Sequence, residues 1–489
     1  MQTTPIVLIF FLALGLLFWG YKRAQPKGKF GILSWLQSVV LMAPWFIFVG
    51  FFILGIYLNI AAFLLLLVAS VIAYICLGRS LRAEGQDMML QQPAITPLER
   101  ETASREQDNI TPSGLPIDPE ELKIIQGIFG VDTFFATETI PYLEGAIFKG
   151  NLRGETEFVH TRLSQKLKES LGEKYRLFLV EGPEDKPVVV VLPSSNDPQP
   201  ATLGQKNLAL VLFVATIATS LEASSLLQGF DFFSELGKFW EALPLALGLF
   251  TVLSAHEIGH RIWGRRYNVT MGLPFFIPSW QIGSFGAITR LQSVIPNRTA
   301  LFEIALAGPA LGGIVSLFIF IVGLILSHPG SAFEIPTPFF QNSILVGILG
   351  RLVLGSALQG EVVGVNPLTM VGWFGLTITA LNLLPAGQLD GGRMVQSIYG
   401  RQIARRATIT TLIILGIVAF LNPANPIPLY WGIVIIFLQR DLEKPCLNEL
   451  TEPDDTRAGL ALLALFLMLA ILIPLSPSLS VNLGIGTGL

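Results

Sequence analysis

Two histidines and a glutamate stand at the end of an apolar run, in the stretch LFTVLSAHEIGHRIWGRR at residues 249–266. In a helix, positions i and i+4 share a face, so His256 and His260 can present two imidazoles to one ion, with Glu257 beside them. HExxH is the zinc-protease spacing, with the glutamate as general base. Chance placement of interhelical hydrogen-bonding groups is the competing interpretation, but the chain has only 4 histidines. The pattern predicts a metal site in which nitrogen ligands favour zinc over calcium or magnesium, with iron and cobalt still open.

A catalytic zinc needs a third protein ligand and an open position for water. The chain lacks the third histidine of the HExxHxxGxxH pattern, so an acidic residue from a later segment is required. Glu303 opens a helix, where the helix dipole explains a carboxylate, and Glu361 lies in a loop on the opposite side. Asp390 lies in ALNLLPAGQLDGGR, whose proline and glycines would break a helix, and such irregular backbone is tolerated where protein lines a cavity. We therefore select Asp390.

The two motifs are expected at similar depth. Arg261 lies one residue beyond His260, and Arg393 lies three beyond Asp390. At about 1.5 Å per residue, both motifs fall within about 10 Å of a basic exit. Water can then reach both from that side.

Apolar segments must carry these residues, because the chain of 489 residues is 52% hydrophobic and only 14% charged, with a mean hydropathy of +0.61. Spans of about 20 residues cross a bilayer. The prediction is an α-helical polytopic membrane protein, embedded in the lipid bilayer, with about ten spans. Candidates lie near residues 5–21, 32–57, 60–78, 205–227, 242–263, 301–326, 366–385, 403–421, 427–438 and 459–475.

The distribution of Lys and Arg predicts how the spans are oriented in the membrane. The net charge is only −3, and the basic residues are clustered, which argues against a nucleic-acid partner. When the spans are threaded alternately, the basic clusters fall on one side, which is then the cytoplasm, or the stroma in a plastid. The candidate metal site should lie near this face.

A small soluble domain is expected before the catalytic spans. Asp118 followed by proline and two glutamates starts a helix, residues 140–150 suggest a strand, the stripe from Val159 to Leu171 suggests a second helix, and residues 175–181 and 187–192 suggest strands. This predicts a cytoplasmic α+β domain. The full division is residues 1–78, three spans; 79–117, polar linker; 118–193, the small domain; 194–204, linker; 205–440, membrane catalytic core; 441–489, linker and C-terminal span.

Several motifs together resemble those of a known family. HExxH in one span and NLLPAGQLDGG in a later one are similar to the paired signatures of the site-2 protease family of intramembrane zinc metalloproteases. LAGPALGG at 306–313 resembles the family's Gly-Pro motif, and GSFGAITR at 283–290 resembles its membrane-associated strand. GNLRG at 150–154 resembles the mark of the EGY-type branch of chloroplasts and cyanobacteria.

The resemblance and the residues imply one function. We expect one zinc per chain, held by His256, His260 and Asp390, with Glu257 as general base, and hydrolysis of peptide bonds within or next to the spans of membrane protein substrates. The location implied is the plasma or thylakoid membrane of a cyanobacterium, or a chloroplast membrane. The alternatives are a catalytically silent chaperone or scaffold of the same fold, and a metal-ion transporter.

Three further residues are candidates for substrate binding. A substrate span must unwind before attack, and the strand-like segment 283–289 can accept it by edge addition, with Gly283 and Gly286 allowing close approach. Asn382 is the candidate donor to the substrate carbonyl or backbone. An interhelical hydrogen bond is the alternative role for Asn382.

Overall fold

The computed structural model describes residues 24–53 and 117–486, apart from 143, 183–185, 202, 280, 424 and 440, together with isolated positions before residue 78. The chain divides into two compact units, residues 1–112 with 416–429 and residues 113–415 with 430–489. In the first unit, helix α2 (Gly28–Ile53) covers most of the span predicted at 32–57. The spans predicted at 5–21 and 60–78 and nearly all of the linker at 79–117 lie outside the described residues.

The second unit begins with a four-stranded antiparallel sheet in the order β1-β2-β4-β3. The strands at 175–181 and 187–193 match the predicted ranges. The single strand expected at 140–150 is instead the end of the strand at 134–142, a short connection and most of the strand at 145–152. The first strand escapes prediction because its residues are mostly exposed and do not alternate cleanly. The elements are α5 (Pro119–Gly127), β1 (Phe134–Tyr142), β2 (Gly145–Leu152), α6 (Thr156–Leu171), β3 (Tyr175–Glu181) and β4 (Pro187–Pro193).

The helices of this small domain cover one face of its sheet. Val159, Leu163 and Leu167 recur every four residues on α6, and each is at most 2% exposed against Phe134 and Phe148 of the sheet. The Asp118 side chain accepts a hydrogen bond from the Glu120 amide and caps α5, as predicted. The opposite face carries half-buried apolar side chains that neither helix covers.

Five helices in the described part of the chain are long and apolar enough to cross a membrane. The predicted count of about ten is not confirmed. Helix α11 (Pro367–Asn382) has 16 residues and α13 (Ile427–Val434) has 8, so both are shorter than a full span. The five long helices are α7 (Leu203–Leu227), α8 (Phe239–Arg266), α9 (Arg298–Ile325), α12 (Asp390–Leu421) and α14 (Asp455–Leu472).

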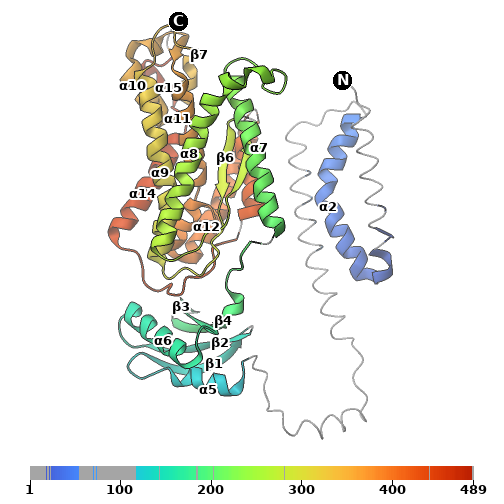
Figure 1. Ribbon diagram of the computed structural model, residues 1–489, viewed down its shortest axis with the longest axis vertical. Helices are drawn as coiled ribbons and strands as arrows, with labels where there is room; N and C mark the ends of the chain where they lie inside the picture. The colour runs from blue at the N-terminus through green and yellow to red at the C-terminus, as the bar shows by residue number, and fades with distance from the viewer. Residues whose placement is uncertain are drawn as a thin grey trace. The chain divides into compact units, whose positions relative to one another are not determined.

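Helix α9 packs against both α8 and α11 (Figure 1). Small residues allow the backbones to approach, because a Cβ at Gly259 of α8 would lie 2.3 Å from the Ala307 carbonyl oxygen of α9. A Cβ at Gly372 of α11 would lie 2.3 Å from the Phe320 nitrogen on the other side of α9. These contacts hold α8 and α11 closely against α9.

A β-hairpin lies beside α7 and α8 (Figure 1). It pairs β5 (Phe275–Ser279) with β6 (Gly283–Ile288), and β6 confirms the predicted strand. The pairing is interrupted at Phe285 and Gly286, where Gly286 has a φ of 103°. Such bulges redirect the backbone next to functional sites. Within the residues described, β6 pairs only with β5, so its second edge has no strand partner.

The segment at residues 446–449 joins the small sheet to the chain that precedes α9. The Leu179 amide of β3 donates to the Leu447 carbonyl at 2.7 Å, and the Glu449 amide donates back to the Leu179 carbonyl at 2.9 Å. On its other side, the Leu447 amide donates to the Ile295 carbonyl at 2.9 Å. This segment therefore ties the small domain to the long apolar helices of the same unit.

Candidate metal centre

The three predicted ligands converge at one point. His256 Nε2 lies 3.1 Å from Asp390 Oδ2, and His260 Nε2 lies 3.4 Å from Asp390 Oδ1. The two Nε2 atoms are 3.2 Å apart. The histidines come from α8, while Asp390 is the first residue of α12, so the structure joins segments that are 134 residues apart in the chain.

The spacing of these donor atoms fits a tetrahedral ion. Zinc bonds of about 2.0 to 2.1 Å place adjacent donors about 3.3 to 3.4 Å apart. One atom from each of the three side chains lies within 4.8 Å of the others. Two imidazole nitrogens and a carboxylate form a donor set that suits zinc. His256, His260 and Asp390 therefore form a candidate metal site in the part of the chain that the structure describes.

Helix α9 orients the histidines. His260 is 4% exposed, and its Nδ1 donates to the Ile304 carbonyl at 2.7 Å, which directs Nε2 toward the site. Two glycines make room for the rings: a Cβ at Gly308 would lie 2.1 Å from His260 Nε2, and one at Gly312 would lie 3.0 Å from His256 Cβ. The glycines of the Gly-Pro motif at 306–313 thus leave space for the two histidine side chains.

The backbone before Asp390 is a compact turn, and helix α12 starts at Asp390 itself. The adjacent glycines are needed because the helix start packs on this turn: a Cβ at Gly391 would lie 1.9 Å from the Leu383 carbonyl oxygen. Arg393 lies one turn further, with Nη1 4.0 Å from Asp390 Oδ1. Its Nε and Nη2 contact Glu443 Oε2 at 3.0 and 2.9 Å, and Nη2 also donates to the Thr289 carbonyl.

Glu257 is held by two neighbours. The Thr289 hydroxyl donates to Oε2 at 2.8 Å, and Arg261 Nε lies 2.8 Å from Oε1. The contact with Arg261 is an ion pair without hydrogen-bond geometry, so within the described residues Oε1 has no hydrogen-bond partner. A cavity of about 10 Å³, close to the volume that one water needs, lies beside it and is lined by His256, Glu257, Gly286, Thr379 and neighbouring apolar side chains.

The predicted substrate-binding residues occupy different places. Gly286 lines this small cavity, and a Cβ there would lie 2.6 Å from Asn382 Nδ2. Asn382 donates to the Ile378 carbonyl at 2.9 Å and to the Phe285 carbonyl of β6 at 3.4 Å. Gly283 faces helix α7 instead, where a Cβ would lie 2.9 Å from Ser220 Oγ. The structure thus brings Asn382 and Gly286 together and places Gly283 outside the cavity lining.

Comparison with known proteins gives the family. Residues 244–422 match peptidase family M50, and residues 123–200 match the EGY3 middle domain. The chain is 36% identical over 408 residues to the probable zinc metalloprotease EGY1, chloroplastic, of Arabidopsis thaliana, covering 76% of this chain and 74% of that protein. The chain belongs to peptidase family M50.

Other relatives place this M50 peptidase in the EGY branch. It is 38% identical over 366 residues to EGY2 of Arabidopsis thaliana, covering 73% of this chain and 65% of that protein. It is 30% identical over 383 residues to EGY3 of the same plant, covering 74% of this chain and 66% of that protein. No solved structure matches the chain. The predicted family and its enzyme class, a zinc metalloprotease, are confirmed.

The other two acidic residues considered as the third metal ligand of this M50 peptidase, Glu303 and Glu361, lie away from the histidines. Glu303 accepts hydrogen bonds from the Tyr267 hydroxyl at 2.7 Å and from Arg457 Nε at 3.0 Å. Its role is therefore to join α9 to α14 and to the end of α8. Glu361 is exposed in the loop before strand β8 (Val362–Val365).

Several residues at the site were not predicted. Thr289 lies in the GSFGAITR motif, but nothing in the sequence paired it with Glu257, and Glu443 carried no sequence signal. Arg393 served only as a marker of depth. Thr379 is 4% exposed, and within the described residues its hydroxyl has no hydrogen-bond partner. The sequence did offer one signal for Thr379: it lies one helical turn before the candidate Asn382, so both side chains can face strand β6.

Proposed function

We propose that this M50 peptidase hydrolyses peptide bonds within or next to the membrane-spanning segments of other membrane proteins, using one zinc ion per chain. One observation carries the proposal: His256, His260 and Asp390 present three ligand atoms within 4.8 Å, and Glu257 lies beside them. The helix that carries three of these residues is long and apolar enough to cross a membrane. Groups capable of hydrolysis on such a helix support cleavage of a substrate span.

Side chains of the protein carry out the proton transfers of the proposed reaction. Zinc, when bound, would lower the pKa of water from 15.7 toward about 7 and polarise the scissile carbonyl. Glu257 takes the proton of the attacking water as that oxygen adds to the carbonyl carbon, and passes a proton to the amine as the C–N bond breaks. Thr289 and Arg261 hold the two oxygens of Glu257 so that the carboxylate stays in place for both transfers.

Strand β6 is proposed to receive the substrate. Its second edge has no strand partner among the described residues, so an unwound substrate can add to it through main-chain hydrogen bonds. Gly286 gives the close approach, and Asn382 would donate to the substrate by exchanging its longer hydrogen bond, the one to the Phe285 carbonyl at 3.4 Å. Gly283 would act only at the far end of this strand, where it packs on α7.

The basic clusters support a metal centre that opens toward the cytoplasm or stroma. Arg261 and Arg393 lie beside Glu257 and Asp390, at the end of α8 that continues to Arg265 and Arg266. The EGY relatives are named as chloroplastic. A thylakoid membrane, or the plasma membrane of a cyanobacterium, is therefore the proposed location.

A comparison of membrane proteomes tests the proposed activity. Membranes with the intact protein are compared with membranes carrying Glu257→Gln, and with Glu241→Gln as a control at the exposed first turn of the same helix. We expect single-span proteins to accumulate uncut with Glu257→Gln and not with Glu241→Gln. If no protein accumulates while zinc remains at one per chain, a silent scaffold replaces the protease. Metal transport without accumulation would support a transporter.

A further inference from the structure

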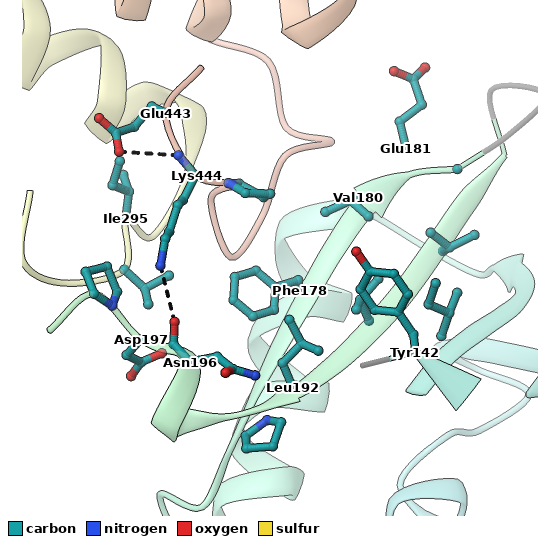
Figure 2. A pocket seen from close by; sticks show the side chains of 18 of the residues that line it. Tyr142, Phe178, Val180, Glu181, Leu192, Asn196, Asp197, Ile295, Glu443 and Lys444 are labelled. Atoms are coloured by element: carbon teal, nitrogen blue, oxygen red, sulfur yellow. Dashed lines mark hydrogen bonds between the residues drawn. The ribbon is translucent and has the colours of Figure 1, made fainter. Parts of the chain in front are cut away.

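The uncovered face of the small sheet forms a cavity of about 840 Å³ (Figure 2). Its floor is apolar and continuous, because Ile147, Val190 and Phe178 lie in register on three adjacent strands. A cavity of this volume lies within the range of specific ligand sites. Figure 2 shows Phe178 and Leu192 standing on the sheet beneath Lys444.

Loops of the membrane part of the same unit close the cavity from the other side. Residues 293–295 and 443–445 line it, and the Lys444 ammonium donates to the Asn196 carbonyl at 3.3 Å across one end. Leu447 donates to the Ile295 carbonyl and accepts from the Leu179 amide of β3, and these two hydrogen bonds fix the loops relative to the sheet. The cavity therefore lies between two anchored walls.

One wall of the cavity is connected to the metal centre. Glu443 lines the cavity and binds Arg393, and Arg393 donates to the Thr289 carbonyl at 3.1 Å. The Thr289 hydroxyl in turn donates to Glu257. Three successive contacts therefore join the cavity wall to the proposed general base.

The charges around the cavity are balanced. Among the charged residues that line it, Asp197 is paired with Arg176 at 3.0 Å, Glu443 with Arg393 at 2.9 Å and Lys149 with Glu138 at 3.0 Å. Glu181 and Lys444 remain, one of each sign. The occupant is therefore indicated by the apolar floor and by the connection of the cavity to the metal centre, and not by charge.

We infer that this cavity binds an extended apolar segment of the substrate that lies on the cytoplasmic side of the scissile bond. The inference rests on the proposed function. Residues 293–295 follow the end of β6 by five residues, which an extended chain covers in about 16 Å. A substrate laid along β6 therefore reaches the cavity with a short continuation. The small domain thereby selects substrates by their flank.

Peptide binding tests this inference without any cleavage. The full chain with Glu257→Gln is placed in lipid nanodiscs, and empty nanodiscs serve as the blank. Two fluorescein-labelled ten-residue peptides are compared by fluorescence anisotropy: one alternates Val and Leu with Thr and ends in two Lys, and one replaces the apolar residues with Ser and Gly. We expect the apolar peptide to bind at least about tenfold more tightly, because its side chains reach the apolar floor.

Variants of one floor residue locate the binding. Val190→Lys buries a charge in the cavity, and Val190→Trp fills it without one; each should weaken binding of the apolar peptide at least about tenfold. Val131→Lys, at a position that is 75% exposed on the same domain and does not line the cavity, should leave binding within about twofold. Thermal melting of each variant separates lost binding from unfolding, and Val190→Trp still decides the result if Val190→Lys unfolds.

Two outcomes would overturn the inference. Equal binding of both peptides would show that the apolar floor does not select them. Displacement of the apolar peptide by oleate, with oleate binding lost in Val190→Trp, would make the cavity a lipid site instead. Either result leaves the proposed protease activity standing, because the Glu257→Gln comparison tests that activity separately.

Discussion

Gly308 of α9 lies against the ring of His260, and a Cβ at Gly308 would come within 2.1 Å of the Nε2 that faces the metal site. We expect Gly308→Ala to displace His260 and weaken zinc binding about 10- to 100-fold, as other changes around metal ligands do. Chelator competition with the purified protein measures the affinity. Gly313→Ala is the control, since its Cβ would meet only Thr379 Cγ2 at 3.4 Å. Unchanged affinity in Gly308→Ala would contradict the geometry of the site.

Asp390 supplies the only carboxylate among the proposed ligands. Asp390→Asn removes its charge, so we expect zinc affinity to fall about 100-fold or more, with loss of bound metal after dialysis. Metal content per chain is the measurement. Glu361→Gln makes the same chemical change at an exposed loop position and should retain its zinc. Full occupancy in Asp390→Asn would require a different third ligand.

Thr379 has a buried hydroxyl without a partner in the described part of the chain, and it lines the cavity beside Glu257. We expect this hydroxyl to donate to the substrate carbonyl, so Thr379→Val should lower kcat about 100-fold with little change in KM. Thr379→Ser keeps the hydroxyl and should restore most of the rate. The assay uses a single-span protein that accumulates in Glu257→Gln membranes. Equal rates for the valine and serine variants would show that the hydroxyl is not used.

Arg393 and Glu443 form a buried ion pair, with side chains 5% and 11% exposed. Arg393→Gln leaves the Glu443 carboxylate without its partner, and the free energy of unfolding should fall by about 3 to 5 kcal/mol. Thermal unfolding in detergent measures the loss. Arg162→Gln breaks an exposed pair with Asp132 and should cost less than about 1 kcal/mol. A loss no larger in Arg393→Gln than in this control would argue against a structural role for the pair.

Local patterns predicted much of the fold. Helical periodicity placed Val159, Leu163 and Leu167 on one buried face of α6, and alternating or continuous apolar residues placed β3 and β4. The span count is not confirmed, because the spans predicted at 5–21 and 60–78 lie outside the described residues and because hydropathy measures composition and not helix length. Residues 366–385 are apolar enough to be counted, yet α11 ends at Asn382, where the chain turns toward Asp390. The role of the small sheet's second face was also hidden, since apolar strands look alike whether covered by helices or lining a cavity.

The sequence alone determined the chemistry: HExxH puts two imidazoles on one helical face because four residues make about one turn, and it puts a carboxylate beside them. The sequence also favoured Asp390 over the other acidic residues as the third ligand. In the structure Asp390 lies beside both histidines, whereas Glu303 is bound to Arg457. Only the tertiary structure decided that Thr289 holds Glu257 and that Arg393 reaches Glu443. Those contacts depend on how separate helices and loops pack, and local periodicity carries no information about the register between segments that are distant in the chain.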